Sequence, residues 1–379
     1  MLRTLAEAVT FFEETLAARP ERDALAADEA AVKGVPHRYP AFAINHLHDP
    51  IDTNASEPFF VLPEREFPDN DQGRLAERII GSLASLDLHN PVGRTVGLEG
   101  ARSPADLVPS FGIPLGKDGG APAYTLPLEE ALKLPKPDPE KSGLMPTFKE
   151  SAVRLRQLLP PGFKIGLPDM QGPFNLAHAM IGDDAFTAPY TDPEAYQALM
   201  ERITAFWIDA RELLVAWVGL DRLHPGSRVP RIAECSVNMV SKDFYQEHIL
   251  PYDLKIAQRL GPLHIHPCSG SHVFKATLEN LPVASTEAGM MIAKMAAPVI
   301  SVREGLARIG KRPVGLDVGQ ELPADRSEAF KIVTDDIDLA LGNPRIRLNG
   351  YTGIFWRRKD RPMIRELHQE LDHYWESQR

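Results

Sequence analysis

The stretch SKDFYQEHILPYDLKIAQRLGPLHIHPCSG, from Ser241 to Gly270, predicts one helix followed by one strand. Its spacing predicts a helix that is capped by Ser241, broken at Pro251 and stopped at Gly261. LHIH at 263–266 then reads as a strand. A helix that leads directly into a short strand is typical of the repeating unit of a parallel α/β sheet.

The same alternation continues on both sides of this stretch. Six strands are expected from Phe163 onward: FKIGLPD (163–169), RIAEC (231–235), LHIH (263–266), PVASTE (282–287), RPVGLDV (312–318) and RIRLNGY (345–351). Helices are expected between and after them, including one at about 326–341 and one from Pro362 to Trp375. Another helix is expected to begin at Thr191 as its cap, with Glu194 completing a capping box.

Two further strands in residues 1–162, which are rich in proline and charge, would complete an eight-stranded barrel. We therefore expect an α/β fold, a distorted (β/α)8 TIM-type barrel that forms one domain over 1–379. Its first part, 1–162, is expected to be irregular and proline-rich, and regular βα units over 163–379 carry the site. An open doubly wound sheet is the alternative, although no glycine-rich phosphate fingerprint follows any predicted strand.

Composition narrows the classes of partner. The formal net charge is −10, which disfavours broad nucleic-acid binding and an anionic membrane surface. The chain has only 2 cysteines, Cys235 and Cys268, so a disulfide framework is not expected and a reducing compartment is. The first residues form no signal-peptide pattern, and no apolar run is long enough to span a bilayer. A cytoplasmic protein that acts on a small molecule is the expectation.

Polar side chains follow nearly every predicted strand, and a (β/α)8 barrel carries its active site at those carboxyl ends. They are Asp169, Glu234 with Cys235, His266 with Cys268, Glu287, Asp317, and Asn349 with Tyr351. Barrel rims are wet, so polar residues are common there in any case. The pattern therefore indicates where a cleft lies more firmly than it indicates a reaction.

The segment LHIHPCSG gives a more specific signal. Residues two apart on a strand point to the same side, so His264 and His266, or His266 and Cys268, could share a face. An imidazole beside a thiolate favours zinc. The alternative is an ordinary buried strand end that carries a hydrogen-bonded histidine and a small buried cysteine. Catalytic zinc usually has three protein ligands, and this stretch supplies two or at most three.

Four segments occur in an order that is more specific than any one of them. They are LPDMQGPFNLAHAMIGDDAF (167–186), YTDPEAYQALMERIT (190–204), VNMVSKDFYQEHILPYDLKIAQRLG (237–261) and HPCSG (266–270). Through them the chain from about Lys164 onward resembles the uroporphyrinogen decarboxylase superfamily, and HPCSG resembles the His-x-Cys-Gly motif of its zinc-dependent corrinoid methyltransferases. The resemblance implies a distorted (β/α)8 barrel.

The resemblance also implies that His266 and Cys268 are zinc ligands, with His264 one step deeper in the strand. An alternative register places His264 at the family's histidine and His266 at its cysteine. A third ligand is expected from Glu287 or Glu234, which both stand at predicted strand ends.

Two departures from the family pattern bear on the activity. The methyltransferases usually carry a second cysteine near the last strand, and Tyr351 stands at that place in NGYTGIF. True uroporphyrinogen decarboxylases carry an arginine-rich N-terminal signature ending in Gln-Ala-Gly-Arg, whereas VPHRYPAF (35–42) keeps one arginine. Decarboxylation in the haem pathway is therefore disfavoured.

Three hypotheses follow for the function. The first is a zinc-dependent methyl transfer between a small substrate or thiol and a corrinoid on a separate protein, with acid/base or ligand roles for Asp169, Glu234 and Glu287. The second is a metal-free, decarboxylase-like lyase that uses Asp169 and Tyr351 on a carboxylated, tetrapyrrole-like substrate. The third is a non-catalytic barrel that binds a tetrapyrrole or a corrinoid protein. The resemblance is also compatible with a homodimer, and the identity of the substrate stays open.

Overall fold

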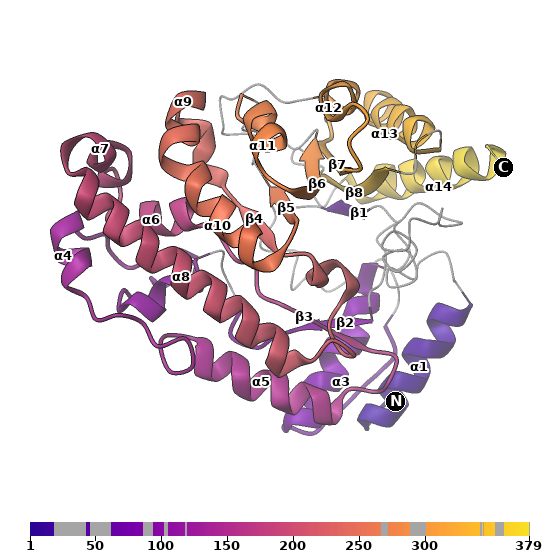
Figure 1. Ribbon diagram of the computed structural model, residues 1–379. Coiled ribbons are helices and arrows are strands. Elements are labelled where there is room, and N and C mark those ends of the chain that lie inside the picture. The colour runs from indigo at the N-terminus through magenta and orange to yellow at the C-terminus, as the bar shows by residue number, and fades with distance from the viewer. Residues whose placement is uncertain are drawn as a thin grey trace.

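Parallel strands and helices alternate along the chain in the computed structural model (Figure 1). The structure describes residues 1–18, 43–45, 62–85, 94–101, 105–117, 120–266, 272–288, 301–341, 343, 345–352 and 360–378. The strands are β1 (Ala43–Asn45), β2 (Thr95–Gly97), β3 (Lys164–Gly166), β4 (Arg231–Ala233), β5 (Leu263–His266), β6 (Val283–Ala288), β7 (Gly315–Glu321) and β8 (Ile346–Thr352). The α-helices are α1 (Leu5–Ala17), α3 (Asp71–Gly81), α4 (Leu128–Lys133), α5 (Met145–Leu158), α6 (Pro173–Ile181), α7 (Asp184–Thr191), α8 (Pro193–Val218), α9 (Lys242–Phe244), α10 (Leu250–Leu260), α11 (Phe274–Asn280), α12 (Val302–Ile309), α13 (Arg326–Leu341) and α14 (Arg361–Ser377).

The strands follow one another around the wall of a barrel. One six-stranded parallel sheet has the order β1-β8-β7-β6-β5-β4, and β2 pairs with β3 in a second sheet. Gln171, just after β3, forms a parallel bridge with Ala233 of β4, which connects the two sheets. Within the described residues no ladder joins β1 to β2. The fold is thus the expected distorted (β/α)8 TIM-type barrel, with two strands before Lys164 and six from it onward.

The helix before β5 keeps its expected cap and its expected end. The Ser241 hydroxyl accepts from the backbone N–H of Phe244, and Gly261 ends α10 with a φ of 93°. The interruption is a π-helical turn at Tyr245–Ile249, one turn before Pro251. Proline has no N–H to offer to the preceding turn, so the helix widens there, and the N–H of Leu250 bonds the carbonyl of Tyr245.

The expectation that Thr191 caps the long helix α8 is wrong. Thr191 is the last residue of α7, and its hydroxyl donates to the carbonyl of Thr187 at 3.2 Å. Asp192 is the cap, because its carboxylate accepts from the N–H of Ala195 at 3.2 Å. Only Asp192 separates α7 from α8. Thr191 therefore belongs to the last turn of α7 and cannot be the N-cap of α8.

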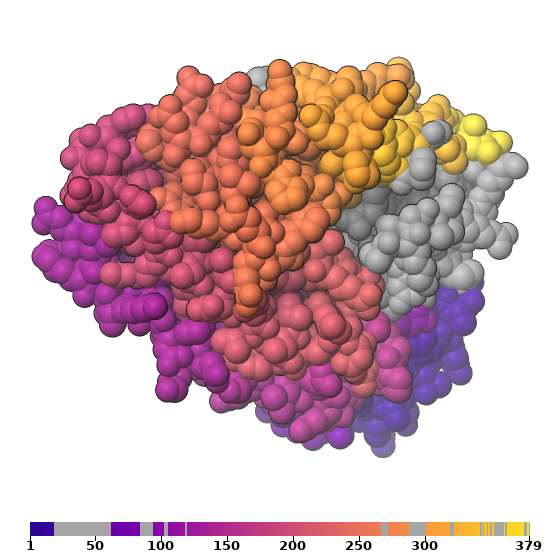
Figure 2. All heavy atoms as spheres, in the orientation of Figure 1, coloured from indigo at the N-terminus to yellow at the C-terminus, as the bar shows by residue number. Residues whose placement is uncertain are grey.

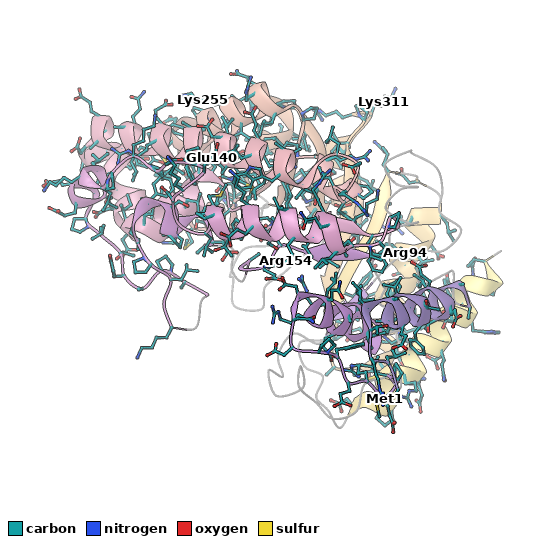
Figure 3. The ribbon with its side chains drawn as sticks, turned by 90° about the horizontal axis from the view of Figure 1, so that it is seen from below. Met1, Arg94, Glu140, Arg154, Lys255 and Lys311 are labelled. Carbon is teal, nitrogen blue, oxygen red and sulfur yellow. The ribbon has the colours of Figure 1, made fainter. Side chains whose placement is uncertain are left out.

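The first part of the chain adds a helical layer beside β2 and β3. Helix α1 begins with a capping box between Thr4 and Glu7, and it packs against α3. Arg94, labelled in Figure 3, donates to Glu13 of α1 at 2.6 Å. This ion pair ties the start of β2 to α1.

Two clusters of buried apolar side chains fill the interior. The larger runs from α1 to the end of α11, and the smaller is built from β7, β8 and helices α11 to α14. Figure 2 shows one face of the molecule, with the indigo and magenta N-terminal parts below the orange and yellow C-terminal parts. None of the helices in the described parts combines the length and the apolar character needed to cross a membrane.

Candidate active site

Strands β4 to β7 bring the polar residues of the candidate site together. Parallel pairing sets Ala233 beside His266, His264 beside Ser285, and Glu287 beside Asp317. His264, Ser285 and Asp317 lie deeper in their strands, whereas Ala233, His266 and Glu287 lie at or next to the carboxyl ends. This is the end at which barrels of this kind carry their chemistry.

Glu287 is the centre of the group. Its Oε1 accepts from Nε2 of His264 at 3.0 Å, and its Oε2 accepts from Nδ1 of His266. A guanidinium nitrogen of Arg231 lies 3.6 Å from the same Oε1. Glu287 is only 6% exposed, so these donors replace the water that a buried carboxylate has lost.

His264 is held from its other side as well. Its Nδ1 lies 2.7 Å from the hydroxyl of Ser285 and 3.5 Å from a carboxylate oxygen of Asp317. These contacts fix the ring so that Nε2 faces Glu287. In metal sites, histidine ligands are commonly oriented by a polar partner on the second nitrogen in this way.

Hydrogen bonds set the protonation states of Glu287 and His266. Burial raises the pKa of Glu287, but the hydrogen bonds from His264 and His266 outweigh it, and the pKa is well below the ordinary value. Burial lowers the pKa of His266, but hydrogen bonds with Cys235 and Glu287 raise it to about 9. Glu287 is therefore a carboxylate at neutral pH, and the metal-free imidazole of His266 is protonated.

Arg231 and Asp169 form the more open edge of the site. Arg231 is the first residue of β4, and its guanidinium donates to a carboxylate oxygen of Asp169. Their side chains are 39% and 40% exposed, in contrast to the buried histidines and Glu287. The sequence placed Asp169 here but missed Arg231, because an arginine at the start of a strand gives no local signal.

Cys235, which the sequence predicts at the end of a strand but not among the zinc ligands, belongs to this group. It follows β4 and forms a side-chain hydrogen bond with His266 of β5. The signal that could have found it is the order of the strands. Consecutive βα units are neighbours in a barrel, so the residue after β4 lies beside the end of β5.

Glu234 and Tyr351 lie apart from the site. Glu234 packs on the Cα of Gly172, where an added Cβ would lie 1.9 Å from its Oε1, and it faces the buried Asp253. Burial and the Asp253 charge raise its pKa well above the ordinary value. Tyr351 donates to Asp336 of α13 at 3.1 Å, so its hydroxyl points into the helical layer.

The donors present fit zinc in kind. Two imidazoles, a carboxylate and a thiol lie close together at one end of the barrel. The His264 ring is held in place by the Ser285 hydroxyl on Nδ1, so that Nε2 faces Glu287. Cys268, the expected sulfur ligand, lies outside the described residues. Within the described residues no three such side chains are already spaced around a metal ion, because they bond directly to one another.

Comparison with known protein families identifies the family of the chain. The profile of the family described as uroporphyrinogen decarboxylase (URO-D) matches residues 94–303, which include β2 to β6. The chain belongs to the uroporphyrinogen decarboxylase family. Comparison with curated proteins finds no match.

Among solved structures, two that resemble the URO-D chain do so at low sequence identity. A methyltransferase from Methanosarcina mazei is 15% identical, with 92% of this chain and 98% of that chain covered and a TM-score of 0.59. A B12-independent methionine synthase from Shewanella sp. W3-18-1 is 13% identical, covering 60% and 67%, with a TM-score of 0.38. At such identity the first of these similarities supports the fold alone.

Proposed function

We propose that this URO-D family chain is a zinc-dependent methyltransferase that moves a methyl group between a small substrate or thiol and a corrinoid on a separate protein. His266, Glu287 and Cys268 are the proposed zinc ligands. The single observation that supports this best is the convergence of two buried imidazoles on the Glu287 carboxylate. A bound zinc ion would supply a deprotonated thiol at neutral pH, which is the nucleophile that methyl transfer requires.

The chain's own residues have separate roles in this proposal. Ser285 and Asp317 hold the His264 ring, and His264 in turn fixes Glu287. Asp169 is partly exposed beside Arg231, and is placed to accept a proton from a substrate thiol or to orient its polar end. The site lies among buried strands, so water is largely kept from the buried donors.

Metal analysis tests the proposal. Protein purified without chelators is expected to hold about one zinc ion per chain. His266→Ala and Cys268→Ala are expected to lose it, and to lose transfer of the methyl group from methylcobalamin to a small thiol. Wild-type protein that is folded but free of metal, and that binds no added zinc, would contradict the proposal.

One observation favours a second candidate, a lyase that acts on a carboxylated substrate without metal. Arg231 is a cation at the open edge of the site, and a guanidinium binds carboxylates well. In this candidate Asp169 acts alone, because the Tyr351 hydroxyl is bonded to Asp336. The same metal analysis separates the two, since this candidate keeps full activity after chelation.

A further inference from the structure

Cys235 stands where β4 ends and a short 3-10 helix (Cys235–Met239) begins. Along β4, alternate residues point to opposite sides of the barrel wall. Arg231 reaches Glu287 and Asp169, so Arg231 and Ala233 of β4 lie on the side of the site, and Cys235 follows just after the strand ends. Glu234 faces the other way, onto Gly172.

The thiol of Cys235 reaches the site through His266. The two side chains share a hydrogen bond, and the backbone holds them together, because the N–H of Glu234 donates to the carbonyl of His266 at 3.0 Å. His266 in turn bonds Glu287. A thiol, an imidazole and a carboxylate therefore stand in series, one from the end of each of three neighbouring strands.

In their deprotonated forms these three groups are all acceptors, so hydrogens lie between them when no metal is present. A divalent cation replaces those hydrogens, because metal binding takes thiolate, neutral imidazole and carboxylate and releases protons. Sulfur and nitrogen donors together select zinc over magnesium or calcium. Together with Cys268 these groups make four protein ligands, and zinc can expand to five-coordinate when a substrate binds.

We infer that Cys235 is a sulfur ligand of the zinc ion, contributed by β4 beside His266 of β5 and Glu287 of β6. This inference rests on the proposed function, and it adds a ligand that the motif HPCSG does not contain. A zinc ion bound in this way would also connect the three adjacent strands β4, β5 and β6.

Cobalt substitution tests the inference by counting sulfur ligands. Metal-free protein is titrated with Co²⁺, and thiolate-to-cobalt absorption in the near ultraviolet is recorded for wild type, Cys235→Ser and the control Ser236→Ala. Ser236 is the next residue, and its hydroxyl lies 2.9 Å from Nδ1 of His178, away from the site. We expect Cys235→Ser to lose at least about half of the absorption and more than about 10–100-fold in zinc affinity, the range found even for outer-shell partners. Ser236→Ala should match wild type.

A second measurement uses the wild-type chain, so that a folding defect in the variant cannot decide the result. Cys235 is alkylated with iodoacetamide with and without one equivalent of zinc, and modification at each of the two cysteines is followed by mass spectrometry. A ligand thiolate is blocked by its metal, so zinc should slow alkylation at Cys235 at least about 10-fold.

The outcomes separate this inference from the proposed function. If wild type binds zinc while Cys235→Ser keeps its absorption and affinity, and zinc leaves the alkylation of Cys235 unchanged, Cys235 is not a ligand and the proposed function stands. If wild type binds neither zinc nor cobalt, both are overturned. Loss of absorption in Cys235→Ser together with zinc protection in wild type supports both.

Discussion

Glu287 shows how one buried charge organises the site. A carboxylate that leaves water costs several kcal/mol, and the cost is offset only where donors surround it. Here the donors are two imidazoles and, at longer range, the guanidinium of Arg231. These side chains therefore stabilise one another, and removal of the central carboxylate leaves buried positive charge.

Glu287→Gln is expected to lower the free energy of unfolding by about 3 kcal/mol, because the variant leaves protonated His266 without its carboxylate. Urea unfolding at pH 7 in the presence of a chelator measures this. The control is Glu140→Gln, whose ion pair with Lys149 at 2.9 Å is exposed and should be worth about 0–1 kcal/mol. Equal losses in both variants would contradict the role given to Glu287.

Asp253 predicts a pH dependence of stability. Burial raises its pKa from 3.8 to about 7, and the hydrogen bond from Tyr245 opposes this shift only in part. A carboxyl whose pKa is higher in the folded state stabilises the fold at low pH, and that stabilisation is lost as pH rises toward 7. Asp253→Asn removes the ionisation, so its stability relative to wild type should rise from pH 4 to 7, by about 1–3 kcal/mol, and then level off.

Urea unfolding of both proteins at pH 4.5, 6 and 8 tests this expectation. Asparagine keeps an acceptor for the Tyr245 hydroxyl, so a constant difference would reflect packing alone. A difference between the variant and wild type that does not grow with pH would show that Asp253 is ionised in the fold over this whole range.

At the scale of an element, the start of α8 depends on Asp192 rather than on Thr191. Asp192→Ala should cost about 1 kcal/mol of unfolding free energy, since the N–H of Ala195 loses its acceptor and the helix dipole loses a nearby negative charge. Thr191→Ala removes only a bond to the carbonyl of Thr187 and should cost less than about 0.5 kcal/mol. Thermal unfolding of the two variants compares them, and the opposite ranking would restore Thr191 as the cap.

The start of α6 depends on the absence of a side chain at Gly172. An added Cβ would lie 1.9 Å from Oε1 of Glu234 and 2.6 Å from Cγ2 of Ile232, so β4 or α6 must shift. Gly172→Ala should therefore cost about 1–3 kcal/mol or more. Gly81→Ala in α3 meets nothing within 4 Å and should be neutral or stabilising by up to about 1 kcal/mol. Two equally stable variants in a urea titration would contradict the close contact.

At the scale of the molecule, the site joins two regions of the interior. Strands β4 and β5 pack in the larger apolar cluster, whereas β7 packs in the smaller one, and Glu287 of β6 stands between them. Zinc bound at the site should therefore stabilise the whole fold. An excess of about 1,000 times the dissociation constant should add about 4 kcal/mol and raise the unfolding temperature.

Scanning calorimetry with and without zinc measures that shift. Glu287→Gln should unfold at a lower temperature and gain much less from zinc than wild type does. A gain of the same size in the variant would mean that the ion binds elsewhere on the chain.

The sequence by itself predicted the order of the six strands from Phe163 onward and the end of the barrel that carries polar side chains. These features are local, because helix caps such as Ser241, helix ends such as Gly261 and the short apolar runs between them depend on residues that are neighbours in the sequence. The order of the strands then followed from the rule that consecutive βα units are neighbours. For the same reason His266 and Glu287 lie at or next to the ends of their strands as expected, and Asp169 follows β3 by three residues.

The side of the barrel wall that each residue faces depends on the tertiary structure. All four residues of β5 are buried, and buried parallel strands lack the polar and apolar alternation that tells inside from outside. In the sequence, Glu234 and Tyr351 therefore stand at strand ends just as Glu287 does, but in the structure their side chains face the helices. Cys235, in contrast, reaches His266 of the neighbouring strand. The direction of a side chain depends on packing from both sides, and that information is not contained in any single stretch.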